Sequence, residues 1–434
     1  MKRRPDPPTR RSADLMLTIY HQERQVGRIQ GEADAPVFVY AASWLARPDA
    51  FPLSVTLPLS TLEADASRFL VWASNLLPEA DQLKMVGLKL GIAPGDTIGL
   101  LEQIGRDTAG ALSFGAPGER SAVGWRPIGT EADLERIIEA LPRKPFLAGE
   151  DGVSMSLAGV QSKIAVARDD QGGLCIPLDG SPSTHILKPD SDRLFGGVPN
   201  EAFCLTLARR CGLAVPPVTT GRAGARSYLL IERYDRRRDG ENWDRLHQED
   251  FCQVLGLPPG AKYERNRTGP RGPSAIDMLG AVRKHALATD LLAMLDAIVF
   301  NILACNTDAH AKNYSLMVTS GRPRMAPLYD VMCASVFEGV TSNLAQTIAG
   351  KDRGDHLRRR HWLRFVREAG FGAGPALRRI GALAEKVLAE IPAARAEVTA
   401  MPAGGVGLDA VSDAVRRRAV MILHGLADEA DADD

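Results

Sequence analysis

The residues of this chain that are able to do chemistry gather in one short run, Asn306-Thr-Asp-Ala-His-Ala-Lys-Asn313. Asp308 and Asn313 are five positions apart, which is the spacing of the carboxylate that orients an attacking hydroxyl and the amide that holds magnesium in phosphoryl-transfer enzymes. Asp330 follows seventeen residues later and would supply a second metal carboxylate. Any one of these spacings also occurs in an ordinary capped turn, but the complete set favours a phosphoryl-transfer site.

Two short apolar runs, 314–318 and 325–329, lie between this loop and Asp330, and the turn residues Thr-Ser-Gly-Arg-Pro join them. Apolar runs bounded by such turn residues predict a β-hairpin. We therefore expect the hairpin to bring the carboxylates of Asp308 and Asp330 to the same end of a sheet.

A turn of small residues, Ser156-Leu-Ala-Gly-Val-Gln-Ser-Lys163, enters a predicted strand at 164–167. Such a turn lets backbone N–H groups approach a polyphosphate, and Lys163 would add a positive charge. The alternative is that the glycine serves only the turn. Because the chain contains neither GxxxxGKS nor GxxxxGKT, the P-loop NTPase class loses its main support.

Lys188 ends another predicted strand, 184–188, among apolar neighbours. Burying an unpaired ammonium costs on the order of a few kcal/mol, so the side chain either reaches solvent or is held by an anion. The turn upstream and Asp330 downstream favour contact with a phosphate, and Glu201 in the next helix is a candidate partner. Asn200 is expected to cap that helix.

After the predicted strand 228–231 the chain continues Glu232-Arg-Tyr-Asp-Arg-Arg. Backbone groups that leave a sheet edge are free to bind an adenine ring, in which case Tyr234 would cover the base and Asp235 would bind a ribose hydroxyl. A charged turn between two lobes explains the same residues equally well.

His310 raises a second chemistry, because an Asp-x-His pair also suits a metallohydrolase. A hydrolase would supply further His or Cys ligands, and the other histidines form no second cluster. Two carboxylate or amide oxygens together with phosphate oxygens suit magnesium better.

Composition is that of an ordinary globular chain: of 434 residues, 45% are apolar and 24% are charged, with 53 basic and 53 acidic side chains. Zero net charge gives no indication of direct binding to nucleic acid or to an anionic membrane. The six cysteines show no metal-ligand spacing, which favours a reducing, cytoplasmic setting. No signal peptide or membrane span is recognised, so we expect a soluble protein.

Strand patterns dominate the first half of the chain and helical patterns the second, which predicts an α+β protein with two lobes and chemistry at their junction. We divide the chain into a disordered basic tail (1–12), a β-rich N-terminal subdomain (13–127), a β-rich lobe with the phosphate loop and hinge (128–236), a helical lobe (237–425) and an acidic tail (426–434).

These motifs, in this order, resemble the HipA family of serine/threonine kinase toxins from bacterial toxin–antitoxin pairs. The resemblance runs from about residue 15 to about residue 425. It rests on Asn75-Leu-Leu-Pro-Glu and Ile104-Gly-Arg-Asp-Thr-Ala-Gly-Ala in the opening subdomain, and on the phosphate turn, the Lys188 strand, Gln248-Glu-Asp-Phe-Cys-Gln and the Asp308 run later. It implies a protein-kinase-like fold.

By this resemblance Asp308 is the catalytic base, Asn313 and Asp330 hold Mg²⁺, and Ser156 is autophosphorylated in trans, which ejects its loop and stops the enzyme; Ser154 competes for that assignment. The ATP-binding residues implied are Ala158, Gly159, Val160, Gln161, Ser162 and Lys163 of the phosphate loop, Lys188, Glu232, Arg233 and Tyr234 of the hinge, and His310, Lys312 and Asn313.

The resemblance further implies that the target is an aminoacyl-tRNA synthetase, most often the glutamyl enzyme, whose phosphorylation halts translation and promotes persistence. It implies a small helix-turn-helix antitoxin of the HipB kind, which alone would bring the pair to DNA. Ser162, where an acidic residue is common, and the basic N-terminal extension depart from the family pattern and leave the protein substrate open. The alternatives are a small-molecule kinase on the same scaffold and a non-catalytic corepressor.

Overall fold

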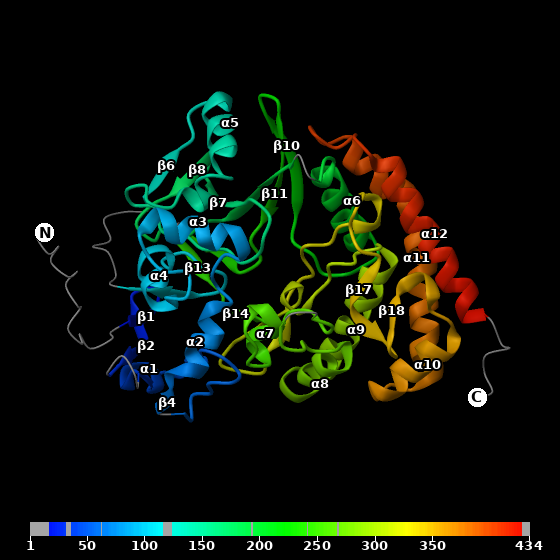
Figure 1. The fold of residues 1–434 in the computed structure, drawn as a ribbon, viewed down its shortest axis with the longest axis horizontal. Helices are drawn as coiled ribbons and strands as arrows, with labels where there is room; N and C mark the ends of the chain where they lie inside the picture. The colour runs from blue at the N-terminus through cyan, green and yellow to red at the C-terminus, as the bar shows by residue number, and fades with distance from the viewer. Residues whose placement is uncertain are drawn as a thin grey trace, which may run out of the picture.

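The structure, a computed structural model, describes residues 17–31, 36–61, 63–115, 124–191, 194–240, 242–266 and 269–427. The predicted basic tail, and residues 428–434 of the predicted acidic tail, lie outside the described residues. The β-rich half of the molecule and its helical half lie side by side, which confirms the prediction of a two-lobed α+β protein (Figure 1).

The N-terminal subdomain is built on a five-stranded antiparallel sheet with the order β4-β3-β2-β1-β5. Its core is aromatic, with Trp44, Phe69 and Trp72 almost fully buried. Its elements are β1 (Leu17–His21), β2 (Arg24–Gln30), β3 (Val37–Tyr40), α1 (Ala42–Leu45), β4 (Glu63–Asp65), α2 (Ala66–Ser74), α3 (Ala80–Leu90), α4 (Thr97–Ile104) and β5 (Leu112–Phe114).

The second sheet has six strands in the order β10-β11-β9-β7-β8-β6, and every pairing in it is antiparallel. Residues 125–127, which we assigned to the first unit, form β6 and join this sheet. Its elements are β6 (Trp125–Pro127), α5 (Glu131–Ala140), β7 (Ile164–Arg168), β8 (Leu174–Pro177), β9 (His185–Pro189), α6 (Gly197–Arg210), β10 (Val218–Ala223) and β11 (Arg226–Glu232).

Helix α6 packs between this sheet and the helical lobe. The prediction that Asn200 caps it is wrong, because the helix begins at Gly197 after Gly196, whose φ of 82° only glycine adopts without strain. Asn200 is instead buried inside the helix, where it hydrogen-bonds the backbone of Cys333 in both directions, at 3.0 and 2.8 Å. An interior helical position therefore holds the chain just after Asp330.

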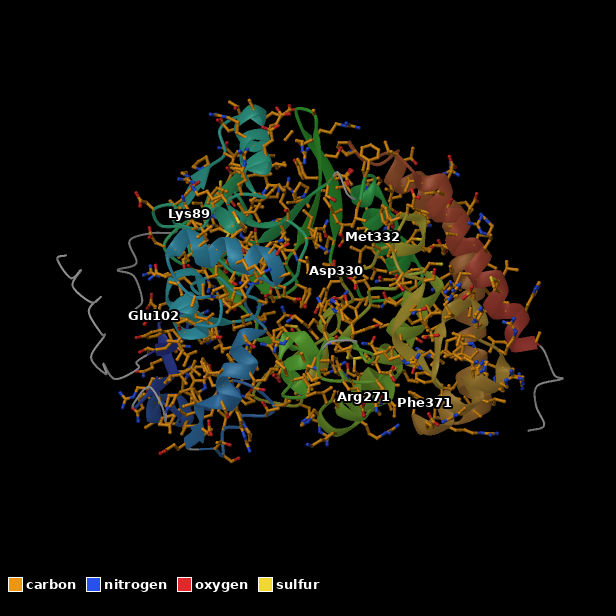
Figure 2. The ribbon with its side chains drawn as sticks, in the orientation of Figure 1. Lys89, Glu102, Arg271, Asp330, Met332 and Phe371 are labelled. Carbon is orange, nitrogen blue, oxygen red and sulfur yellow. The ribbon has the colours of Figure 1, made fainter. Side chains whose placement is uncertain are left out.

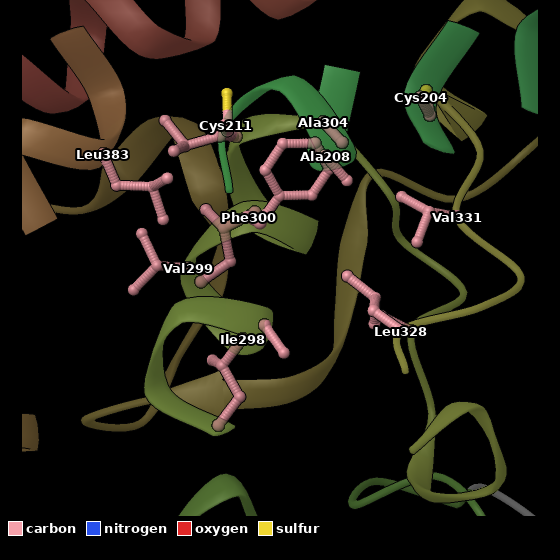
Figure 3. Packing of buried hydrophobic residues seen from close by; sticks show 14 of the residues in the cluster. Cys204, Ala208, Cys211, Ile298, Val299, Phe300, Ala304, Leu328, Val331 and Leu383 are labelled. Carbon is pink, nitrogen blue, oxygen red and sulfur yellow. The ribbon is translucent and has the colours of Figure 1, made fainter. Parts of the chain in front are cut away.

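The helical lobe forms the largest apolar core, and α6 contributes to it (Figure 3). Cys204 and Cys211 of α6, Phe300 of the long helix α9 and Leu383 of α11 belong to this one cluster. The lobe consists of α7 (Phe251–Val254), α8 (Ala275–His285), α9 (Ala288–Leu303), α10 (Arg359–Glu368), α11 (Ala373–Thr399), α12 (Leu408–Ala427) and the hairpin of β17 (Asn343–Ile348) and β18 (Lys351–Arg353). None of the described helices has both the length and the apolar character needed to cross a membrane.

A small sheet lies at the junction of the lobes. The predicted hairpin is confirmed in shortened form, since β15 (Ser315–Met317) pairs with β16 (Arg324–Met325), and β14 (Gln248–Asp250) pairs with the other edge of β15. A short hairpin of β12 (Arg236–Asp239) and β13 (Asn242–Arg245) precedes β14. Strands β15 and β16 of this small sheet lie within the segment that connects Asp308 to Asp330.

Candidate active site

Three charged side chains from three separate elements meet at the centre of the molecule, where Figure 2 labels Asp330. The ammonium of Lys188, on β9, donates to Glu201 Oε1 of α6 at 2.7 Å and to Asp330 Oδ1 at 2.6 Å. Lys188 and Glu201 are buried, whereas the side chain of Asp330 is 39% exposed. The pairing of Lys188 with Glu201 that we anticipated is confirmed.

Each of these charges depends on the others. Burial disfavours the ammonium of Lys188, yet Asp330 and Glu201 hold its pKa above the ordinary value. Burial likewise opposes ionisation of Asp330, but Lys188 and Lys163 keep its pKa well below the usual range. Burial raises the pKa of Glu201 above its ordinary value, and the charge of Lys188 only partly offsets that effect.

The backbone around Asp330 is held in an unusual conformation. Asp330 has a φ of 58°, in the left-handed region that a non-glycine residue occupies only when its surroundings enforce it. Asn306 provides part of that constraint, since its Nδ2 donates to the carbonyl oxygen of Asp330 at 3.2 Å. The carboxylate is thereby aimed at Lys188.

Asn306 also orders the loop that carries Asp308. Its Oδ1 accepts the backbone N–H of Asp308 at 3.1 Å, and Asn313 Nδ2 donates to the carbonyl oxygen of Asp308 at 3.0 Å. The loop is thus closed by two side-chain amides, and Asn306 connects it directly to the Asp330 segment.

The carboxylate of Asp308 remains exposed to solvent, although Tyr263 Oη donates to its Oδ1 at 2.5 Å. Partial desolvation and the charge of Asp330 raise its pKa, while the Tyr263 bond opposes that rise. His310 is buried against the Tyr263 ring, and burial keeps its pKa well below the ordinary value. His310 is therefore neutral and offers a ring rather than a cation.

The phosphate loop is folded against the N-terminal subdomain. Ser156 is completely buried, and its Oγ donates to the carbonyl oxygen of Leu76 at 2.7 Å. Gly159 has a φ of +108°, and a Cβ there would lie 2.5 Å from Lys163 Nζ, so this position requires glycine. Lys163 Nζ donates to the Ala158 carbonyl oxygen at 2.8 Å.

Lys163 is electrostatically linked to the central charges. Burial and the nearby charge of Lys188 lower its pKa to about 8, while Asp330 opposes the shift. The ammonium groups of Lys163 and Lys188 thus lie close enough to interact with the carboxylates of Asp330 and Glu201, and ammonium groups are also donors for phosphate oxygens. The assignments of Val160, Gln161 and Ser162 stay predictions.

The residues at hand suit magnesium better than a transition metal. Within the described ranges, no three His, Cys, Asp or Glu side chains form a metal-ligating group. Asn313 and Asp330 offer an amide and a carboxylate oxygen, and magnesium usually takes few protein ligands and completes its shell with water and substrate phosphates. The residues present therefore fit this ion.

Some residues that motif reasoning assigned to the nucleotide have other partners. The ammonium of Lys312 is buried and donates to Asp250 Oδ2 at 2.6 Å and to both the backbone and side-chain oxygens of Asn75, so the prediction of a nucleotide contact by this side chain is wrong. The side chain of Arg233 is likewise buried, bound to Asp235 and to the carbonyl oxygen of Thr108.

The ribose contact predicted for Asp235 fails for the same reason, since its carboxylate accepts from Arg233 and from the backbone N–H of Gly110. Glu232 is exposed, but its backbone N–H is bonded to the Pro217 carbonyl oxygen. Tyr234 lies beside Tyr329 with ring centroids 5.8 Å apart, and its hydroxyl donates to Gln248. Its hinge role stays a prediction.

Two contributors escaped the sequence reasoning. Tyr263 has no motif around it, and only its contact with Asp308 reveals it. Asn306 lies in the same run, and an amide two residues before a catalytic-type Asp is a signal that sequence reasoning was able to use.

Comparison with known proteins completes the description. Residues 17–115 match the model of the HipA N-terminal domain, and residues 155–394 match that of the HipA-like C-terminal domain. A putative kinase, Y4mE of Sinorhizobium fredii, is 34% identical over 94% of this chain and 98% of its own length. The serine/threonine-protein kinase toxin HipA of Shewanella oneidensis is 32% identical over 77% of this chain and 78% of its own.

Solved structures agree with the sequence comparisons. A HipA chain in the complex of Shewanella oneidensis HipA with HipB and operator DNA superposes with a TM-score of 0.83 at 25% identity, over 96% of this chain and 100% of that one. The architecture, including that of the N-terminal subdomain, is therefore shared with that structure over 96% of this chain.

Proposed function

Since this chain belongs to the HipA family, we propose that it is an ATP- and Mg²⁺-dependent serine/threonine protein kinase that acts as the toxin of a toxin–antitoxin pair. The observation that carries the proposal is the charge cluster of Lys188, Glu201 and Asp330 beside the loop of Asp308 and Asn313. A lysine held by a helix glutamate, next to a metal-type carboxylate, is the arrangement by which protein kinases orient ATP phosphates.

Each side chain has a definite task in this proposal. Lys188 and Lys163 hold the phosphates, and Asp330 and Asn313 would hold the magnesium, which when bound supplies positive charge against the transferring phosphoryl group. Asp308 accepts the proton of the attacking hydroxyl. Its raised pKa and exposed position suit an incoming protein substrate.

Self-inactivation is proposed for Ser156. Its hydroxyl now donates to the Leu76 carbonyl oxygen, and the residue is completely buried. A phosphoserine carries about −1.5 to −2 charges and accepts rather than donates hydrogen bonds, so it does not fit against a carbonyl oxygen. Phosphorylation at this position would therefore require the loop to leave the site. Ser154 is bonded to Gln103 and the Arg106 backbone and is the competing position.

Substrate and partner are proposed from the family. The target is an aminoacyl-tRNA synthetase, the glutamyl enzyme first, and its modification would halt translation and promote persistence. A HipB-like antitoxin would bind the chain and bring it to DNA, which the HipA–HipB–operator complex of the structural relative supports. All six cysteines are unpaired thiols, which supports a cytoplasmic setting.

The test is phosphoryl transfer by purified protein with radiolabelled ATP, together with growth on expression. Asp308→Asn and Asp330→Ala should abolish both autophosphorylation and growth arrest. Asp170→Ala, at an exposed carboxylate on the β7–β8 turn, is the matched control and should leave both unchanged. Transfer by either active-site variant at the wild-type rate would refute the proposal. Whole-cell phosphoproteomics of the wild type against Asp308→Asn identifies the substrate and separates a protein kinase from a small-molecule kinase.

A further inference from the structure

The N-terminal subdomain sends one short segment into the junction of the lobes. Residues 75–79, Asn-Leu-Leu-Pro-Glu, follow α2 directly. Leu76 and Leu77 are each 2% exposed, and the fixed φ of Pro78 limits the backbone between them and Glu79. The segment is therefore anchored rather than a mobile loop, and its polar groups have defined directions.

Asn75 holds the loop of the proposed catalytic base through Lys312. The Lys312 ammonium donates to the Asn75 carbonyl oxygen at 2.9 Å, to Asn75 Oδ1 at 3.1 Å and to Asp250 Oδ2 at 2.6 Å. An ammonium has three donors, so these bonds use its whole capacity and fix its position. Lys312 directly precedes Asn313, whose amide closes the Asp308 loop.

Glu79 reaches the same loop by a second route. Its Oε2 accepts from Lys262 Nζ at 2.6 Å, and the carbonyl oxygen of Lys262 accepts the backbone N–H of Ala311 at 3.1 Å. Both partners of this ion pair are about nine-tenths buried. Displacement of Lys262 would therefore be felt at Ala311, in the middle of the catalytic-type run.

The same five residues also hold the phosphate loop. The Leu76 carbonyl oxygen accepts from Ser156 Oγ, and the backbone N–H of Glu79 donates to the Gly159 carbonyl oxygen at 3.3 Å. Gln82, in the first turn of α3, donates to the Val160 carbonyl oxygen at 2.5 Å. One segment of the N-terminal subdomain thus touches both loops between which phosphoryl transfer would occur.

Docking of the subdomain does not depend on these contacts. Ser54 Oγ and the Val55 N–H donate to buried Glu249 at 2.7 and 2.8 Å. Elsewhere, Asp107 of the subdomain is ion-paired with Arg236 at 2.8 Å, and Arg245 donates to the Arg106 carbonyl oxygen at 2.6 Å. The domain interface therefore has hydrogen bonds and ion pairs that do not involve Asn75 or Glu79. The contacts of these two residues instead hold the phosphate loop and the Asp308 loop.

We propose that Asn75 and Glu79 are positioning residues of the active site, supplied by the N-terminal subdomain to set the phosphate loop and the Asp308 loop relative to one another. The proposal rests on the kinase function proposed above. It gives the subdomain a part in phosphoryl transfer itself.

The test compares Asn75→Ala with Ser54→Ala, a matched variant that removes an interdomain hydrogen bond to Glu249 rather than a bond to Lys312 or to the phosphate loop. For Asn75→Ala we expect kcat to fall at least tenfold while KM for ATP changes less than threefold. Ser54→Ala should keep kcat within twofold. Glu79→Gln, which removes one charge without a cavity, should lower kcat severalfold and serves if Asn75→Ala fails to fold.

Hydrogen exchange, followed by mass spectrometry, gives a readout that needs no activity. Peptides covering 306–314 should exchange faster in Asn75→Ala and Glu79→Gln but not in Ser54→Ala. Unchanged kcat in both loop variants, or an equal loss in Ser54→Ala, overturns the inference. If the wild type transfers no phosphate, the kinase proposal falls, and the exchange rates alone then decide whether Asn75 and Glu79 order the loop.

Discussion

Removal of the Lys188 ammonium is the sharpest perturbation of the central charge cluster. Lys188→Met would leave Glu201, which is 2% exposed, facing Asp330 with no cation 2.7 Å away. Breaking a buried ion pair by deleting one partner costs about 3–5 kcal/mol, because the remaining charge is uncompensated. At about 2–4 °C per kcal/mol for a domain of this size, the melting temperature should fall on the order of 10 °C.

The second substitution separates this cause from simple loss of packing. Glu201→Gln in the Lys188→Met background removes the stranded buried charge, and Asp330 remains partly solvated. The double variant should therefore be more stable than Lys188→Met alone, with a coupling free energy of about 2 kcal/mol or more. Lys84→Met is the control: its partner Asp81 is 91% exposed, and the pair should contribute less than about 1 kcal/mol.

The loss in Lys188→Met should also depend on pH. Burial already raises the pKa of Glu201, and without Lys188 the rise is larger. A carboxyl whose folded-state pKa is raised contributes stability below its unfolded pKa and loses it as pH rises through the folded value. The difference in stability between wild type and the variant should therefore be smallest at acidic pH. Thermal melts from pH 5 to 8 measure this; additive single effects, or a difference independent of pH, would contradict the buried-charge argument.

Three further predictions concern neighbouring groups. Burial raises the pKa of Glu249 to about 7. Its contribution to the free energy of unfolding is therefore full below its unfolded pKa of about 4.5 and is lost as pH rises through 7. Glu249→Gln should remove this pH dependence, about 3 kcal/mol of unfolding free energy, and thermal melts at several pH values measure it. In Gly159→Ala the new methyl group would contact Lys163, and ATP binding measured by calorimetry should weaken at least tenfold while the protein stays folded. Gly240→Ala is the control, because its Cβ would have open space around it and ATP binding should not change. The pKa of Lys163 is about 8, so its ammonium loses its charge as pH rises above 8 and ATP affinity should decline. ATP binding above pH 8 should be accompanied by proton uptake. Lys163→Arg, which keeps its charge, should make the affinity less dependent on pH.

Sequence reasoning succeeded where local spacing specifies a structural element. The hairpin between Asp308 and Asp330 and the strand that carries Lys188 are each specified by a few adjacent residues. The pairing of Lys188 with Glu201 was within reach because an isolated lysine among apolar residues demands an anion.

It failed where a side chain chooses between partners that are distant in sequence. We predicted Asn200 as a helix cap because Asn favours that position. Its amide instead hydrogen-bonds the buried backbone of Cys333, 133 residues away in the sequence. The helix begins at Gly197, four residues before the start that an Asn200 cap would give. Local propensity was outweighed by the need to satisfy buried backbone groups.

Lys312 shows why a motif alone does not assign a ligand contact. It stands one residue from Asn313, yet its partners Asp250 and Asn75 lie 62 and 237 positions away along the chain. A buried ammonium must be paired, and it forms an ion pair with the carboxylate that the tertiary fold places beside it. Here that carboxylate follows Glu249 on β14, and successive residues there turn to different partners: Glu249 to the N-terminal subdomain and Asp250 to the active-site loop. Because successive side chains of a strand point to opposite faces, Glu249 contributes to domain docking and Asp250 to the position of the active-site loop. Charged residues with such structural roles are distinguished from residues available to bind ATP only by their burial and by their hydrogen-bond partners.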